Sequence, residues 1–133
     1  MGRLTGDQVR HLTGMMDERF AREIDEIDAV TARSRAERGQ EALAGFPADH
    51  LDAALAEIAS EADYAVVRQD VADVRDILAA RLRVNAGTYG TCVDCGEAIG
   101  YQRLLAYPTA KRCIACQREH ESELGARVGR HAR

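Results

Sequence analysis

Four cysteines carry the strongest chemical signal in this sequence. They form two Cys-x-x-Cys pairs, Cys92 with Cys95 and Cys113 with Cys116, and 17 residues separate the pairs. Thiolates at this spacing are typical of a structural zinc site, in which four protein ligands fill the tetrahedron and leave no position for water or substrate. We therefore predict one structural Zn²⁺ held by Cys92, Cys95, Cys113 and Cys116.

The same cysteines also suit two disulfides, a redox-active Cys-x-x-Cys pair or an iron site of the same geometry. The first residues lack the apolar stretch of a secretory signal, and the longest apolar runs, such as residues 77–80, are far too short to span a membrane. We therefore expect a cytoplasmic protein with no membrane partner. Thiols in that compartment stay reduced or bind metal, which favours zinc over disulfides, and two paired motifs exceed what one redox centre requires.

No residue pattern nominates an enzyme active site. The four histidines are scattered, no Ser or Thr stands in a nucleophile motif, and Gly-rich phosphate loops are absent. A closed metal site also disfavours catalysis at the metal. We expect a protein that is not an enzyme.

Two amphipathic stripes precede the cysteines and predict two long helices. Residues 4–43 carry apolar side chains three or four apart, and residues 51–86 carry a second stripe with a slip of one residue after Ala62. Thr5 and Gln8 have the spacing of a capping box at the start of the first helix. Gly87 is placed to end the second helix.

The two stripes fit one antiparallel register. Facing residues then have numbers that add to 94, and the predicted pairs are Leu43 with Leu51, Ile27 with Val67, Phe20 with Val74, Met16 with Leu78 and Leu12 with Leu82. The segment between the stripes, residues 44–48, contains Gly and Pro, which break helices. A two-helix seam also explains why the chain has only four Tyr, two Phe and no Trp.

These patterns predict a mainly α fold with two domains. Residues 1–86 form a long antiparallel coiled-coil hairpin with its tip at residues 45–52. Residues 87–133 form a small four-cysteine zinc-finger module with a C-terminal helix.

The predicted tip is acidic. The chain has a formal net charge of −4, and no Lys or Arg occurs from Gly39 to Val67, where six acidic residues do. Free-standing binding to duplex DNA is therefore poorly supported. Composition alone leaves open whether this end is a solvated helix start, where the helix dipole favours Asp, or a functional surface.

A resemblance to a known family emerges from two segments. Residues 87–99, Gly-Thr-Tyr-Gly-Thr-Cys-Val-Asp-Cys-Gly-Glu-Ala-Ile, with residues 103–110 and Cys-Ile-Ala-Cys at 113–116, closely resemble the DksA/TraR family of bacterial transcription factors. Asp-His-Leu-Asp-Ala-Ala at residues 49–54 resembles the family's tip signature, Asp-x-x-Asp-x-Ala.

The resemblance implies a regulator that binds RNA polymerase directly. Its coiled-coil tip would enter the secondary channel and modulate transcription initiation at selected promoters, while the zinc module rests on the polymerase rim. Asp49, Asp52 and Ala54, which we call the tip motif, would carry the effect. The resemblance implies no sequence-specific DNA binding, and we expect a monomer.

The resemblance also bears on the alarmone of the stringent response, guanosine tetraphosphate. Family members that respond to it carry basic residues at positions that correspond here to Asp76, Tyr107 and Gln117. We therefore expect a weak or absent alarmone response.

Two other functions stay open. A zinc-ribbon nucleic-acid-binding or adaptor protein would use Arg103, Lys111, Arg112 and Arg118 as a basic face. Its support is thin, because acidic residues share the same module. Stimulation of transcript cleavage is a third possibility, since unrelated channel factors also present acidic coiled-coil tips.

Overall fold

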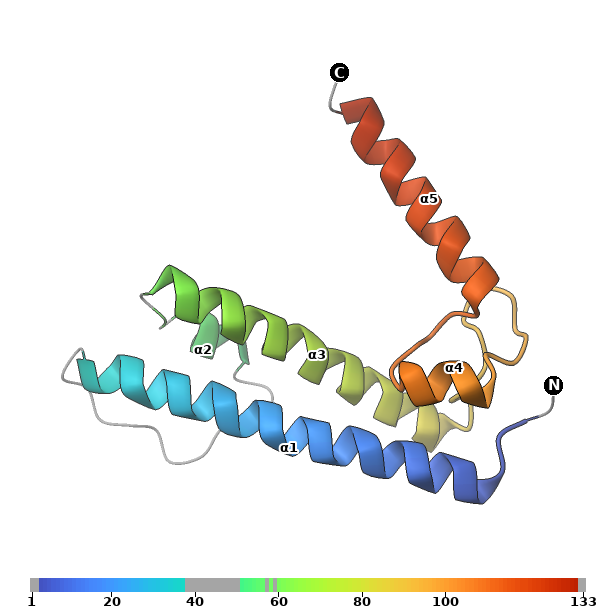
Figure 1. Ribbon diagram of the computed structural model, residues 1–133, viewed down its shortest axis with the longest axis horizontal. Coiled ribbons are helices and arrows are strands. Elements are labelled where there is room, and N and C mark those ends of the chain that lie inside the picture. The colour runs from blue at the N-terminus through green and yellow to red at the C-terminus, as the bar shows by residue number, and fades with distance from the viewer. Residues whose placement is uncertain (1–2, 38–50, 57, 59, 132–133) are drawn as a thin grey trace. The chain divides into compact units, whose positions relative to one another are not determined.

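The computed structural model describes residues 3–37, 51–56, 58 and 60–131, with side chains to residue 124 (Figure 1). Its helices are α1 (Gly6–Glu37), α2 (Leu51–Ala56), α3 (Glu61–Ala86), α4 (Tyr101–Ala106) and α5 (Ile114–His131). Among these residues no strand forms beyond an isolated β-bridge. The chain divides into two compact units, residues 16–78 and residues 1–15 with 79–133. None of the described helices is long and apolar enough to cross a membrane.

The start of α1 confirms the predicted capping box. The backbone N–H of Gln8 donates to Thr5 Oγ1 at 3.1 Å, and the backbone N–H of Thr5 donates to Gln8 Oε1 at 2.9 Å. Two amides that the first helical turn leaves without backbone partners are thereby satisfied.

The end of α3 confirms the predicted glycine stop. Gly87 has a φ of 76°, and its N–H donates to the carbonyl of Val84 at 3.2 Å. The N–H of Thr88 reaches back to the carbonyl of Arg83 at 2.9 Å. This pair of bonds is the Schellman motif, which requires the left-handed backbone that glycine adopts without strain.

Within residues 16–78, α1 and α3 lie side by side as an antiparallel pair (Figure 1). Arg19 donates to Asp73 at 2.5 Å, and Arg33 donates to Asp63 at 3.3 Å. The numbers of these partners add to 92 and 96, on either side of the predicted 94. The predicted register of the hairpin is therefore confirmed in this unit.

A hydrophobic cluster fills the seam between these helices. It contains residues at most 7% exposed from all three helices of the unit, namely Ile27, Val30, Leu51, Ala54, Val67, Val71 and Val74. Phe20, Ile24 and Leu78 pack against it and are partly buried. Burial of aliphatic side chains stabilises such a seam by about 1.5–3 kcal/mol for each fully buried residue.

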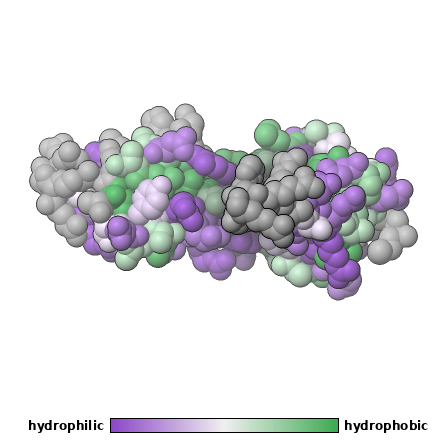
Figure 2. Space-filling view, turned by 90° about the horizontal axis from the view of Figure 1, so that it is seen from above, coloured by the Kyte–Doolittle hydropathy of each residue, from purple (hydrophilic) through white to green (hydrophobic). Residues whose placement is uncertain are grey.

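The prediction that Leu82 faces Leu12 was wrong. Leu12 is fully buried, but Leu82 is 70% exposed, and the buried positions of α3 before it are Ile77 and Ala80. A helix turns by about 100° per residue, so a stripe extended in steps of four rotates away from the seam. Other large hydrophobic side chains are exposed as well, and Figure 2 shows hydrophobic patches among hydrophilic residues on one face.

The prediction of one continuous second helix was also wrong. It forms as two helices, α2 and α3, with a break before Glu61. Ser60 caps the second piece, because its Oγ accepts from the backbone N–H of Asp63 at 3.4 Å and its carbonyl accepts from Tyr64 at 2.9 Å. The break lies between Leu55 and Val67, where the apolar stripe slips by one residue.

The predicted turn at residues 44–48, Leu43 and most of the tip at 45–52 lie outside the described residues.

Carboxyl groups face one another across the α1/α3 seam. Glu23 lies near Asp73, and Asp70 lies near Glu26. One carboxyl oxygen each of Glu23, Asp73 and Asp70 is buried without a hydrogen-bond partner among the described residues. Burial, and then the Asp73 carboxyl, raise the pKa of Glu23 to about 8, although Arg19 opposes the shift. Burial and Glu26 raise the pKa of Asp70 to about 6, with a smaller contribution from Asp73. A proton shared within each pair supplies the donor that two carboxylates lack.

We predict that the stability of the fold decreases as the pH rises from about 4 to about 8. Up to about pH 8 the folded chain keeps a proton on Glu23, and up to about pH 6 it keeps one on Asp70, whereas the unfolded carboxyls release these protons at their pKa values of 4.5 and 3.8. Glu23→Gln should remove about 1–2 kcal/mol of this loss between about pH 6 and about pH 9, less than the full shift because water reaches the pair's rim.

Urea unfolding followed by circular dichroism measures the effect, with Glu18→Gln as the matched control on the exposed side of α1. The control shares any pH dependence that comes from the metal site. Parallel pH profiles for wild type and Glu23→Gln would contradict the shared-proton interpretation.

Candidate functional site

The first cysteine pair lies on a tight loop closed by backbone bonds. Thr91 and Ala98 form the β-bridge, and the N–H of Cys92 donates to the carbonyl of Glu97 at 2.7 Å. Gly96 follows Cys95 with a φ of 77° and donates to the carbonyl of Cys92 at 3.0 Å. This left-handed glycine turns the chain so that both thiols face the same side.

The second cysteine pair lies where α5 begins. The N–H of Cys116 points at Cys113 Sγ at 3.5 Å, and the carbonyl of Cys113 accepts from Gln117 at 2.9 Å. The predicted C-terminal helix is confirmed as α5, which begins at Ile114. The helical turn that starts α5 thus also orients the second pair of thiols.

The four thiols converge on one point. All four Sγ atoms lie within 4.8 Å of one another, and Cys95 Sγ lies 3.8 Å from Cys113 Sγ, far longer than a disulfide bond. The cysteines are free thiols, so the two disulfides left open by the sequence do not form. This arrangement fits a single tetrahedral ion with thiolate ligands, the donor set that zinc takes in closed structural sites.

Hydrogen bonding shifts the pKa values of the thiols in opposite directions. Burial raises the pKa of Cys92, but backbone amides of Cys113, Cys95 and Asp94 outweigh it and bring the value to about 6. The neighbouring thiols of Cys113 and Cys95 raise the pKa of Cys116. Four sulfurs this close cannot all ionise without a cation, and a divalent ion supplies the missing charge. The residues present therefore fit one structural Zn²⁺.

Interactions within the module hold the two loops together. The N–H of Val93 donates to the carbonyl of Lys111 at 2.9 Å, and Arg112 Nε donates to Asp94 Oδ2 at 2.7 Å. Arg103 Nε donates to the carbonyl of Arg112 at 3.1 Å. Arg103 and Arg112 thus make internal contacts, which weakens the basic face that a nucleic-acid-binding module would need.

Tyr89 joins the module to the chain that follows α4. Its hydroxyl donates to the carbonyl of Pro108 at 2.7 Å, and burial raises its pKa to about 12. Arg83 donates to the carbonyl of Thr109 at 3.3 Å, so the last turn of α3 holds the same segment. The sequence did not predict α4, although Gly100 and Pro108 bracket it.

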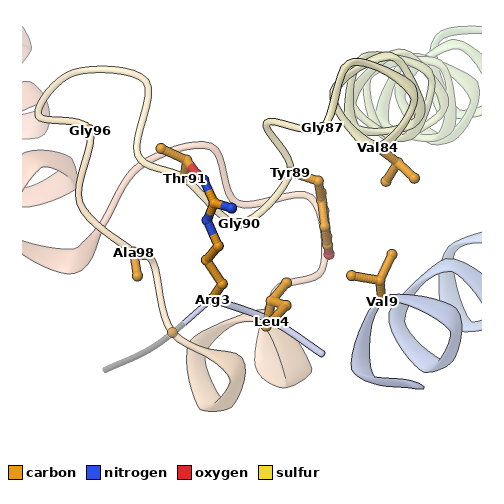
Figure 3. Close-up of a pocket in the computed structure, with 11 residues that line it drawn as sticks. Arg3, Leu4, Val9, Val84, Gly87, Tyr89, Gly90, Thr91, Gly96 and Ala98 are labelled. Atoms are coloured by element: carbon orange, nitrogen blue, oxygen red, sulfur yellow. The ribbon is translucent and has the colours of Figure 1, made fainter. Parts of the chain in front are cut away.

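A cavity of about 410 Å³ lies between the N-terminal segment and the first cysteine loop (Figure 3). Leu4 packs beside Gly90, which has a φ of 86°. A Cβ at Gly90 would meet Leu4 Cδ1 at 2.8 Å, so the close approach requires glycine. Arg3 and Tyr89 also line the cavity.

The residues of the tip motif do not share one exposed surface in the structure. Asp49 lies outside the described residues. The side chain of Asp52 is 85% exposed on α2 and forms an ion pair with Arg75, whereas Ala54 is 1% exposed in the hydrophobic cluster. Asp52 and Ala54 therefore lie on opposite faces of α2. No sequence pattern indicated Arg75 as a partner of Asp52, because a continuous helix would hold residues 23 positions apart at a distance of about 35 Å.

We predict that removing the metal unfolds the cysteine module. The full chain should bind one zinc per molecule, and either Cys113→Ser or a chelator should abolish zinc binding. Backbone amides of residues 87–122 should then exchange rapidly, while those of α1 and α3 within residues 16–78 keep part of their protection. Metal analysis and hydrogen exchange provide the two measurements. Unchanged protection of the module in metal-free protein would contradict a structural role.

Comparison with known proteins gives matches concentrated on this module. Residues 87–122 match the model of the prokaryotic dksA/traR C4-type zinc finger. An uncharacterized protein of Aquifex aeolicus is 41% identical over 56 residues, 42% of this chain and 39% of the relative. The RNA polymerase-binding transcription factor DksA of Caulobacter vibrioides is 49% identical over 39 residues, 29% of this chain and 28% of the relative.

The chain thus spans well under half the length of these relatives, and no solved structure matches it. The matches and the four convergent thiols nevertheless agree on the same residues. They support a DksA/TraR-type C4 zinc finger at residues 87–122 of this chain.

Proposed function

We propose that this protein is a cytoplasmic regulator that binds RNA polymerase directly and inserts its acidic tip into the secondary channel. The zinc finger and the DksA relative support a DksA-like transcription factor. The observation that carries the proposal is a DksA-type finger joined to an antiparallel helix pair whose tip motif presents the exposed carboxylate of Asp52. Polymerase binding, the channel and the tip roles of Asp49, Asp52 and Ala54 belong to the proposal.

The helices have the reach that the proposal needs. Helix α1 has 32 residues and α3 has 26, which at 1.5 Å per residue correspond to about 48 Å and about 39 Å. Helices of this length can carry a small acidic segment far from their opposite ends.

The charge of the tip suits a channel lined by basic groups and magnesium. No Lys or Arg occurs from residue 39 to residue 67, so no basic side chain within this segment competes for its carboxylates. Long-range attraction would speed the encounter with a basic pore and would weaken with salt. The tip would then change the stability of the open promoter complex, and with it repression or activation according to the promoter.

The zinc finger's part in the proposal is structural. Zinc would fix the two cysteine loops against each other, and Val93 and Ile114, each next to a ligand, present exposed hydrophobic side chains beside the site. Such side chains are suited to a protein surface, and in the proposal that surface is the polymerase rim. The nucleic-acid alternative has less support, because Arg103 and Arg112 bond within the module.

We predict that Asp52→Asn reduces the promoter effect by about tenfold or more while polymerase affinity stays within about twofold. Loss of one charge at the tip should remove the action there but leave the larger binding surface intact. Asp49→Asn should behave in the same way. In vitro transcription and a binding assay with purified polymerase measure the two quantities, and Asp25→Asn on the exposed side of α1 is the control.

Normal regulation by both tip variants would contradict the tip assignment. Steeply salt-dependent binding to bare DNA without polymerase would instead support the nucleic-acid alternative. Adding guanosine tetraphosphate to the same assay tests the expected weak alarmone response, and a backtracked complex tests transcript cleavage.

A further inference from the structure

Helix α2 lies back along α3 and does not extend the hairpin. Leu51 and Ala54, at 3% and 1% exposure, belong to the same cluster as Val67 and Val71 of α3. On its outer side Asp52 reaches Arg75, 23 residues further along the chain. In a continuous helix that separation would be about 35 Å. The apolar contacts and the ion pair therefore specify the same docked position of α2.

The sequence between α2 and α3 does not compel the break. It reads Glu-Ile-Ala-Ser at residues 57–60 and contains neither Gly nor Pro, so it is compatible with helix. Leu51, Leu55, Ile58 and Ala62 follow one another at helical spacing across it. A continuous helix from Leu51 into α3 is thus a second arrangement that this sequence supports.

The polar contacts that hold the docked arrangement are easily exchanged. The Asp52 and Arg75 side chains are 85% and 51% exposed, and ion pairs this open to water stabilise weakly and are screened by salt. The cap at Ser60 exists only while the helix is broken, because in a continuous helix the Asp63 N–H would bond to a backbone carbonyl instead. A basic partner surface would compete with Arg75 for Asp52.

We propose that α2 is a detachable element that controls presentation of Asp52 and Ala54. In the docked state Ala54 is buried, and the Asp52 carboxylate, although 85% exposed, is paired with Arg75, which offsets its charge. Contact with a basic surface of the polymerase releases α2, which joins α3 as one helix. This inference rests on the proposed function, since it concerns the same tip motif. It also explains how Ala54, which is buried in the isolated protein, can act in a complex.

The first test measures docking in the free, zinc-loaded full chain. Methyl NMR should show contacts from the methyl groups of Leu51 and Ala54 to those of Val67 and Val71. Arg75→Gln should weaken these contacts severalfold. Arg68→Gln, one heptad earlier on the same face of α3, should leave them unchanged. Absence of the contacts in wild type, or their full retention in Arg75→Gln, would overturn the proposal.

A second variant holds the docked state. Glu61→Pro places proline at the first position of α3, where it is tolerated, but in a continuous helix its ring would clash with the carbonyl four residues earlier. It should keep the methyl contacts and lose the promoter effect. Glu61→Gln controls for the lost charge and should regulate normally.

Transcription assays on the same variants separate the proposed function from the control of that function by α2. Arg75→Gln should lower the concentration for half-maximal promoter effect severalfold, and Arg68→Gln should not. If wild type has no promoter effect, the proposed function fails, while NMR still reports docking. Control by α2 is overturned if wild type regulates but Arg75→Gln releases α2 without changing the concentration for half-maximal effect. It is also overturned if Glu61→Pro regulates normally.

Discussion

The hydrophobic seam between α1 and α3 is the interaction on which the 16–78 unit depends. Aliphatic side chains at helical spacing fix its register, and that register decides which polar groups meet beside it. Because of this register, Glu23 faces Asp73 and Arg19 can reach both. The seam also has room for a third helix, so Leu51 and Ala54 of α2 complete the same cluster. The position of the tip motif is thus a consequence of packing.

The cysteine module is organised by a different constraint, the convergence of four thiols that require a cation. Its remaining polar groups serve that geometry: Arg112 bonds to Asp94, and Arg103 bonds to the carbonyl of Arg112. With all four metal positions supplied by protein, the site offers structure and no open coordination position. A closed metal site of this kind orders the chain around it, and in the proposed function regulation is left to the helices.

Local and periodic signals in the sequence predicted most of the fold and the metal site. The capping box of Thr5 and Gln8, the stop at Gly87 and the four metal ligands each depend on residues close in sequence or on fixed spacing. The register of the seam followed from periodicity, and it could also have located Glu23 opposite Asp73. The docking of α2 had no such signal, because Leu51 fits a continuous stripe as well as a folded-back one, and the choice depends on tertiary contacts such as Asp52 with Arg75.

Proximity of the tip motif to the polymerase channel is the most direct test of the account. A photoreactive amino acid in place of Ala53, which is exposed next to Asp52, would be activated in a complex of the full, zinc-loaded chain with RNA polymerase. The account predicts crosslinks to polymerase segments that line the secondary channel, and none from the same group in place of Asp25 on α1. Crosslinks only to the outer surface of the polymerase, or only to DNA, would contradict it.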